Sequence, residues 1–242
     1  MSLILDLLFP KKCVSCKKEG SYFCKDCILN IKQGDLICPK CEKLAVGGQT
    51  HPICERKYGL DGLWSLGLYK QSFPSPDGER QNPLRAAIQS LKYKYIEDLS
   101  KILLDITLEY WIRYQPFVLD QIKKVQGVGW AVAPVPLHWY KENKRGFNQS
   151  SLLGKSFAQS LGLDYLDCLK RTRYTKSQTK LRGKDRYQNI KSAFSLDSKF
   201  MIHDSEILLI DDVWTTGSTM KECCYVLKRS GAKKVWGITL AR

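Results

Sequence analysis

The feature that constrains this chain most is a series of closely spaced cysteines near its start. Four pairs of metal-binding residue types, each pair separated by two residues, lie before residue 55. A two-residue gap lets both side chains turn toward one ion, and four such ligands complete a tetrahedral zinc site. In chain order the ligands are Cys13, Cys16, Cys24, Cys27, Cys38, Cys41, His51 and Cys54. The pattern predicts two structural Zn²⁺ sites, which supply folding energy that so small a module otherwise lacks.

The order of the pairs predicts which ligands share an ion. In sequential pairing the first zinc takes the four cysteines between residues 13 and 27, and the second takes Cys38, Cys41, His51 and Cys54. An interleaved pairing also satisfies the spacing. If His51 is instead a surface residue, the second site keeps three cysteines or stays without metal. A disulfide scaffold is the remaining interpretation, and a reducing cytoplasm disfavours it.

Length and composition favour one full domain in addition to this module. The chain has 242 residues, of which 43% are hydrophobic, so a substantial core is expected. No apolar run approaches the roughly 18 residues of a membrane span, and the apolar segment 3–9 lacks the flanks of a signal peptide. We therefore expect a cytoplasmic protein without a membrane span. Residues 1–58 are expected to form a zinc-ribbon module, and residues 59–242 the main domain.

Periodic apolar patterns in the main domain predict strands that alternate with helices. Strands are expected over 63–69, 130–135, 207–210 and 235–240. Helices are expected from Pro83 onward after the cap Asn82, along the apolar stripe 96–106, and over 149–161 and 218–230. The segment 72–80 contains two prolines and a glycine and is predicted to be a loop. This alternation is typical of an α/β fold with a parallel sheet.

The most specific pattern in the main domain spans 207–219. A hydrophobic run leads into Asp211 and Asp212, and the helix that follows begins with a turn of Thr215, Thr216, Gly217, Ser218 and Thr219. The free N–H groups at a helix start suit a phosphate, and a glycine lets the ligand approach the backbone. Two carboxylates beside a phosphate are repulsive unless they bind something else, and sugar hydroxyls and, indirectly, Mg²⁺ are the expected partners. No lysine follows the glycine, which excludes a Walker loop.

This segment resembles the phosphoribosyl pyrophosphate signature of type I phosphoribosyltransferases. The resemblance implies that Asp211 and Asp212 bind the ribose hydroxyls and that residues 215–219 surround the 5′-phosphate. Together with the cysteine pairs and the segments 82–93, 133–137, 144–149 and 171–194, the chain resembles the ComF family of competence-associated proteins. Members of that family couple a zinc ribbon to a phosphoribosyltransferase-like domain. The resemblance covers nearly the whole chain and is interrupted by an insert at 72–81 and by His51, where a cysteine is expected.

The family resemblance also implies a fold, a reaction and partners. It implies a type I phosphoribosyltransferase-like parallel sheet flanked by helices, with pyrophosphate held by the turn at Pro136 and by Lys144 and Arg145. An enzyme of this kind would use Asp211, Asp212 and Arg145 in catalysis, with Mg²⁺ stabilising the departing pyrophosphate. The acceptor is not indicated. A role in DNA uptake during transformation, among competence or DNA-processing proteins, is implied as well.

A strongly basic stretch supports a second functional hypothesis. The formal net charge is +15, and the stretch 170–191 carries nine lysines and arginines against one acid. It is expected either to cover the sugar site or to form a solvated face. Single-stranded DNA could be bound by Arg171, Arg173, Arg182 and Arg186, while core packing is the favoured role of the aromatic residues Trp139, Tyr140 and Phe147. The alternative function is therefore a non-catalytic single-stranded DNA-binding module, or a regulator that senses a sugar phosphate.

Overall fold

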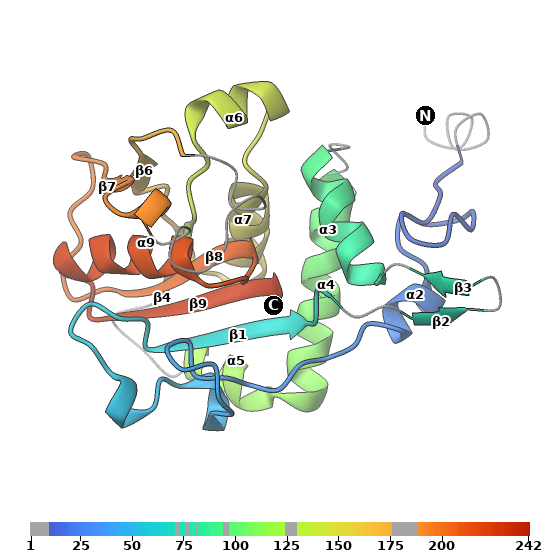
Figure 1. The fold of residues 1–242 in the computed structure, drawn as a ribbon, viewed down its shortest axis with the longest axis horizontal. Coiled ribbons are helices and arrows are strands. Elements are labelled where there is room, and N and C mark those ends of the chain that lie inside the picture. The colour runs from blue at the N-terminus through green and yellow to red at the C-terminus, as the bar shows by residue number, and fades with distance from the viewer. Residues whose placement is uncertain are drawn as a thin grey trace.

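The computed structural model describes residues 10–70, 73–75, 78–80, 82–93, 97–123, 130–175 and 188–242. At its centre is a five-stranded sheet in the order β1-β9-β8-β4-β5, in which all neighbouring strands are parallel. Figure 1 labels four of these strands, β1, β4, β8 and β9. The strands are β1 (Gly62–Gly67), β4 (Trp130–Pro134), β5 (Asp164–Tyr165), β8 (Glu206–Val213) and β9 (Lys234–Ala241). The parallel sheet confirms the predicted α/β fold, and four of its five strands coincide with predicted ones.

Helices cover both faces of the sheet. The helices α3 (Pro83–Tyr93), α4 (Glu97–Tyr114), α5 (Pro116–Lys123) and α7 (Gln149–Leu161) pack on one face, and α9 (Ser218–Arg229) packs on the other. Side chains alternate along a strand, so Leu208 and Ile210 join the first layer while Ile207 and Leu209 join the second. All four are almost completely buried, as expected for a parallel sheet covered on both sides.

Residues at both ends of α7 fix its start and its end. The side-chain oxygen of Asn148 accepts a hydrogen bond from the N–H of Ser150 at 3.0 Å and starts α7, and Gly162, with a φ of 66°, ends it. The predicted bounds of this helix are therefore confirmed. Asn148 also donates through its amide nitrogen to the carbonyl of Val135 at 3.1 Å, which ties the start of α7 to the end of β4.

Two expectations for the main domain need correction. The segment 72–80 was predicted to be a loop, but its described residues pair as antiparallel strands β2 (Phe73–Ser75) and β3 (Gly78–Arg80). A two-stranded ribbon has free edges, and a proline is tolerated there because its missing N–H need not face a partner strand. The helical stripe predicted over 96–106 is longer than expected: α4 continues to Tyr114, and Pro116 starts the further helix α5. Residues 71–72, 76–77, 81 and 96 lie outside the described residues.

The N-terminal segment packs against the main domain. Its short helix α2 (Lys25–Leu29) buries Cys27, and three cysteines of this segment belong to the same apolar cluster as α3 and α4. Backbone hydrogen bonds attach it further, including one of 2.8 Å from the N–H of Leu68 to the carbonyl of Lys32. The boundary at residue 58 stays a prediction. None of the helices in the described ranges combines the length and apolar character needed to cross a bilayer.

Candidate functional site

A cavity of about 250 Å³ lies where β4 and β8 reach their carboxyl ends. This is the edge at which open parallel sheets bind ligands. The cavity is lined by eight residues that the sequence had predicted, namely Pro136, Arg145, Asp211, Asp212, Thr215, Gly217, Ser218 and Thr219. It is also lined by residues that the sequence had not predicted for this site, among them Lys92, Tyr93, Lys141, Asn148, Ser150 and Arg171.

The two acids lie within the last part of β8, which runs three residues beyond the predicted end of the hydrophobic strand because the backbone pairing with β9 continues as far as Val213. Asp212 is 5% exposed, and its carboxylate lies 2.6 Å from the ammonium nitrogen of Lys92. The carboxylate of Asp211 accepts hydrogen bonds from the Ser150 hydroxyl at 3.0 Å and from the N–H of Asp212 at 2.9 Å. The cavity therefore contains one acid paired with a cation and one acid held by neutral donors.

Burial and neighbouring charges shift the pKa values of Asp211 and Lys92. Burial, followed by the negative charge of Asp212, raises the pKa of Asp211 to about 7. Burial alone would lower the pKa of Lys92, but the charge of Asp212 and its hydrogen bond outweigh burial, so this pKa is raised. Lys92 thus stays charged, and Asp211 changes its charge near neutral pH.

The turn before α9, which was predicted to surround a phosphate, requires its glycine. Gly217 caps α9 with a φ of 66°, and a Cβ atom at this position would overlap the indole ring of Trp214. Only glycine therefore allows the turn to take this path. The hydroxyl oxygens of Thr216 and Ser218 lie 2.8 Å apart. Thr216 is the one predicted hydroxyl residue of this turn that is not among the described lining residues of the cavity.

The cations of the cavity differ in part from those predicted. Helix α6 (Trp139–Arg145) presents Lys141 and Arg145, four residues apart and therefore on one face. Lys144 is exposed and, within the described part of the chain, does not line the cavity. Burial, together with the charges of Arg171 and Arg145, lowers the pKa of Lys141. A bound anion would relieve this crowding of positive charge.

Arg171 was predicted to contact nucleic acid, but the structure places it in the cavity. It lies in β6 (Leu169–Arg171), which pairs with β7 (Phe194–Leu196). Its guanidinium donates to the Thr175 hydroxyl and lies 5.3 Å from the Phe194 ring centre. The Nε–H of Arg171 is buried and has no hydrogen-bond partner among the described residues. A buried donor of this kind fits an oxygen of an anionic ligand.

The other predicted nucleic-acid contacts are placed only in part. Arg173 is exposed and donates to the backbone carbonyls of Asn189 and Lys191 at 3.1 and 2.7 Å. Arg182 and Arg186 lie outside the described residues, as does the rest of the segment 176–187.

The aromatic residues near α6 do not share one environment. Phe147 is buried, as expected for a packing role, but Trp139 and Tyr140 are 64% and 52% exposed, so the expectation of packing is wrong for them. Tyr174 lies beside them, with its ring centre 5.8 Å from that of Tyr140 and 5.8 Å from the ammonium nitrogen of Lys141. Trp139, Tyr140 and Tyr174 are called the aromatic cluster below.

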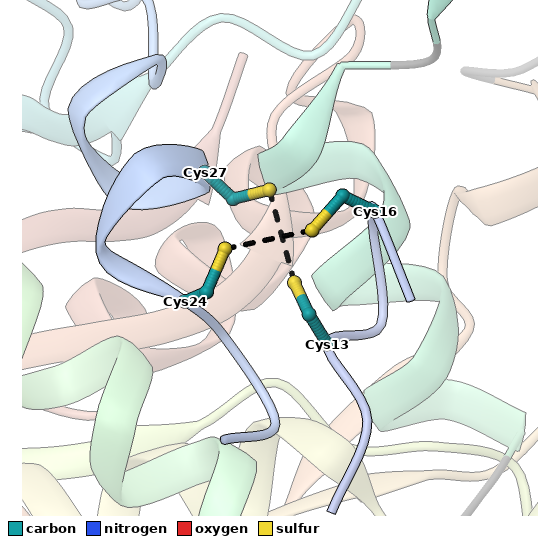
Figure 2. Close-up of side chains that lie close together, drawn as sticks. All are labelled: Cys13, Cys16, Cys24 and Cys27. Atoms are coloured by element: carbon teal, nitrogen blue, oxygen red, sulfur yellow. Dashed lines mark hydrogen bonds between the residues drawn. The ribbon is translucent and has the colours of Figure 1, made fainter. Parts of the chain in front are cut away.

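The first set of predicted zinc ligands converges on one point. Figure 2 shows the sulfurs of Cys13, Cys16, Cys24 and Cys27 turned toward one another. The Cys13–Cys27 sulfurs are 3.7 Å apart and the Cys16–Cys24 sulfurs 3.5 Å apart. Four thiolates around a tetrahedral zinc, with bonds of about 2.3 Å, would lie roughly 3.8 Å from one another. The donor set and its spacing therefore fit this ion.

The second set also converges and includes the histidine. The ligand atoms of Cys38, Cys41, His51 and Cys54 all lie within 4.8 Å of one another. Nδ1 of His51 lies 3.4 Å from the Cys41 sulfur, and Nε2 lies 2.8 Å from the carbonyl oxygen of Leu44. A carbonyl on the outer nitrogen orients the ring of a metal-binding histidine in this way. The structure thus brings together the two sets expected from sequential pairing, and not interleaved ones.

The chain is similar to curated proteins named for competence and DNA utilization. It is 36% identical over 213 residues to the DNA utilization protein YhgH of Escherichia coli K12, covering 88% of this chain and 86% of that protein. It is 31% identical over 238 residues to the competence protein ComFC of Streptococcus pneumoniae, covering 93% and 90%. The match to Competence protein F of Haemophilus influenzae is 40% identical over 115 residues and covers 46% of this chain and half of that protein. No protein-family model matches the chain.

Solved structures with a similar arrangement include phosphoribosyltransferases. Glutamine phosphoribosylpyrophosphate amidotransferase from B. subtilis superposes with a TM-score of 0.34 at 18% identity, covering 69% of this chain and 29% of that chain. Adenine phosphoribosyltransferase from Leishmania donovani gives a TM-score of 0.31 at 15% identity, covering 54% and 52%. Such loose superpositions carry no argument about chemistry. The curated relatives at 31% and 36% identity extend over most of both chains, and on that ground the chain belongs to the ComF family.

Proposed function

We propose that the cavity at the ends of β4 and β8 binds phosphoribosyl pyrophosphate or a closely related sugar phosphate. The observation that supports this most is the placing of two acids, one of them paired with Lys92, directly before a hydroxyl-rich helix start. The N–H groups at Gly217 and Ser218 suit the 5′-phosphate, and the carboxylates of β8 suit the ribose hydroxyls. Lys141, Arg145 and Arg171 supply positive charge for the pyrophosphate.

The reaction that such a site supports is phosphoribosyl transfer to an acceptor that the chain does not identify. The bond from C1 of ribose to pyrophosphate breaks, the electron pair leaves with pyrophosphate, and a nucleophilic atom of the acceptor bonds to C1 and loses its proton. Arg145 and Lys141 would stabilise the charge that develops on the leaving group. Mg²⁺, when bound with the ligand, would neutralise part of the same charge. No protein nucleophile is needed.

We further propose that both cysteine clusters bind zinc in a structural role, since all four positions at each would be filled by protein ligands. The names of the relatives, which refer to competence and DNA utilization, favour a role in DNA uptake. We propose that the protein has this role in the cytoplasm, beside competence or DNA-processing proteins.

Ligand-dependent stabilisation tests the sugar-phosphate site. Phosphoribosyl pyrophosphate with Mg²⁺, at about one hundred times its dissociation constant, is expected to add about 2.7 kcal/mol to the stability of the folded state. For a chain of this size the Tm should rise by roughly 5–10 °C. Arg145→Ala should lose most of this shift because it removes a cation of the cavity. Differential scanning fluorimetry measures the effect.

Lys144→Ala is the matched control, because Lys144 is adjacent in sequence, carries the same charge and does not line the described cavity. It should keep the full shift. An unchanged Tm of the wild-type protein, or an equal loss in both variants, would contradict the proposal. Release of pyrophosphate on addition of candidate acceptors would then separate an enzyme from a sensor.

A second candidate function is binding of single-stranded DNA, and the aromatic cluster favours it. Three aromatic side chains, each more than half exposed, lie beside Lys141 at the edge of the cavity. Nucleobases stack on such rings while cations contact the phosphates. A DNA strand end carrying a 5′-phosphate would suit the same surroundings.

Replacing the exposed rings should weaken DNA binding. Trp139→Ala with Tyr174→Ala is expected to cost about 1–3 kcal/mol for each base that can no longer stack. Fluorescence anisotropy of a labelled oligo(dT) measures the affinity. Tyr114→Ala is the control, because Tyr114 is similarly exposed on α4. Equal affinity of the double variant and the control would remove the aromatic cluster from the binding surface.

A further inference from the structure

A second cavity, of about 580 Å³, lies between the second cysteine cluster and α9. Among the described residues it shares no lining residue with the first cavity. Its walls come from residues 39–40, 50, 54, 56–60 and 191–192 and from Lys221, Glu222 and Tyr225 of α9. Its volume is in the range of about 300–1,000 Å³ that small-molecule sites occupy.

The cavity is strongly positive. Five cations line it, and these are Lys40, Arg56, Lys57, Lys191 and Lys221. Glu222 is the one acid among the described lining residues, and its carboxylate already accepts the N–H of Ser192 at 2.6 Å. Within the described part of the chain, none of the five cations forms an ion pair. A concave surface with this charge concentrates anions, and lysine and arginine bind phosphate oxygens directly.

Two aromatic side chains complete the walls. The rings of Tyr58 and Tyr225 meet edge to face with centres 5.4 Å apart, and the side chain of Tyr225 stays 39% exposed. Lys57 lies over Tyr58, with its nitrogen 5.3 Å from the ring centre. A planar, aromatic ligand group can stack on tyrosine in such a place while its charged part reaches the cations.

We propose that this second cavity binds a nucleotide, with its phosphate held by the lysines and arginine and its base placed against Tyr58 and Tyr225. The chemistry is the same for a free mononucleotide and for one nucleotide of a DNA strand. The assignment does not rest on the sugar-phosphate site. Lys221 lies between the two cavities, because it lines the second one while its ammonium group donates to the carbonyl of Thr216, in the turn before α9, at 3.0 Å. It is therefore left unchanged in the test, which uses cations that have no contact with the phosphate turn.

The test measures binding of 5′-AMP and of an oligo(dT) to the full zinc-loaded chain by calorimetry. Lys57→Glu with Lys191→Glu should weaken binding by about tenfold or more for each lysine that binds a phosphate oxygen in the wild-type chain. Lys101→Glu with Lys199→Glu makes the same change of net charge on exposed residues outside this cavity and should leave binding unchanged. Lys141→Glu with Arg145→Glu reverses charge in the first cavity and should leave the binding of 5′-AMP at the second cavity intact. This variant is tested with 5′-AMP only, because oligo(dT) would also contact the aromatic cluster beside Lys141.

The results with the two probes distinguish a site for free nucleotides from a site for one nucleotide of a DNA strand. Binding of AMP that is abolished only in the Lys57/Lys191 variant supports a site for free nucleotides, and the same effect for oligo(dT) alone supports a nucleotide within a strand. The proposal is overturned if neither probe binds the wild-type chain, or if the Lys57/Lys191 variant binds as tightly as the Lys101/Lys199 control. It is equally overturned if the Lys141/Arg145 variant alone abolishes the binding of 5′-AMP, since the nucleotide would then occupy the first cavity. The exposed positions of Lys57 and Lys191 make these substitutions compatible with folding.

Discussion

Asp212→Asn is expected to destabilise the folded protein by about 3 kcal/mol. The substitution keeps the shape of the side chain and removes its charge, which leaves the ammonium group of Lys92 without the carboxylate that lies 2.6 Å from it. Breaking a buried ion pair by removing one partner costs about 3–5 kcal/mol. We expect the lower end of this range because the side chain of Lys92 keeps 21% of its surface exposed.

Asp211→Asn, one residue earlier, is expected to have the opposite effect. The folded-state pKa of Asp211 is about 7, against an ordinary value of 3.8. Between these values the folded chain holds a proton that the unfolded chain has released, so the stability of the wild-type protein falls as pH rises. Asparagine has no such dependence. The variant should therefore gain stability relative to wild type from about pH 4 to pH 7 and keep a constant advantage above pH 7.

Urea denaturation at pH 5 and pH 8 distinguishes the two variants. Each variant lacks one carboxylate of the same strand, so each serves as the control for the other. The expected order at pH 8 is Asp211→Asn above wild type, and wild type above Asp212→Asn. Equal destabilisation by both substitutions, or an advantage of Asp211→Asn that does not change with pH, would contradict this account. It would show that Asp212 is not stabilised by an ion pair with Lys92 while Asp211 lacks such a pair.

The second large effect concerns the cysteine clusters, whose surroundings differ. Cys13 and Cys27 are buried and pack within the main apolar cluster together with α3 and α4, whereas Cys41 of the second cluster is exposed. Structural zinc contributes about 10–16 kcal/mol to the folding of small zinc-binding modules. Cys27→Ala should therefore disrupt the packing of the N-terminal segment on α3 and lower the Tm of the whole chain. Cys41→Ala should cause a smaller and local loss of stability.

Metal content and thermal unfolding of the two variants test this difference. Each variant is expected to lose one of two bound zinc ions, with the large decrease in Tm confined to Cys27→Ala. A chelator should also remove zinc first from the second cluster, in which Cys41 is exposed. Retention of two ions by both variants, or an equal and small change in Tm, would contradict a metal-dependent link between the first cluster and the core.

The features that could be predicted are those that local spacing determines. The helix α7 has its predicted bounds because Asn148 caps it and Gly162 ends it, and both signals are adjacent to the helix in sequence. The ligand sets of the cysteine clusters follow the order of the pairs for the same reason, since each set closes within a short segment. The glycine in the turn before α9 was expected to let a ligand approach the backbone; the contact that requires it in the structure is with Trp214, three residues away.

The features that were missed depend on contacts between distant segments. Lys92 meets Asp212 across 120 residues of chain, so no local pattern marks it, although it lies in a segment that resembles the family. The choice of Lys144 in place of Lys141 shows the same limit. Both lysines lie on α6, and only the orientation of that helix against the sheet determines which one faces the cavity. The extension of β8 to Val213 depends on pairing with β9. The sequence did not predict it, because the change from apolar to acidic residues at Asp211 is typical of the end of a buried strand.

The most direct measurement of the central claim is a crystal structure of the full chain with phosphoribosyl pyrophosphate and Mg²⁺. The account predicts density for the 5′-phosphate against the backbone of residues 215–219, and ribose hydroxyls within hydrogen-bond distance of Asp211 or Asp212. The pyrophosphate should lie near Arg145 and not near Lys144. A first cavity without ligand, or ligand bound only in the second cavity beside α9, would contradict the assignment of the sugar-phosphate site.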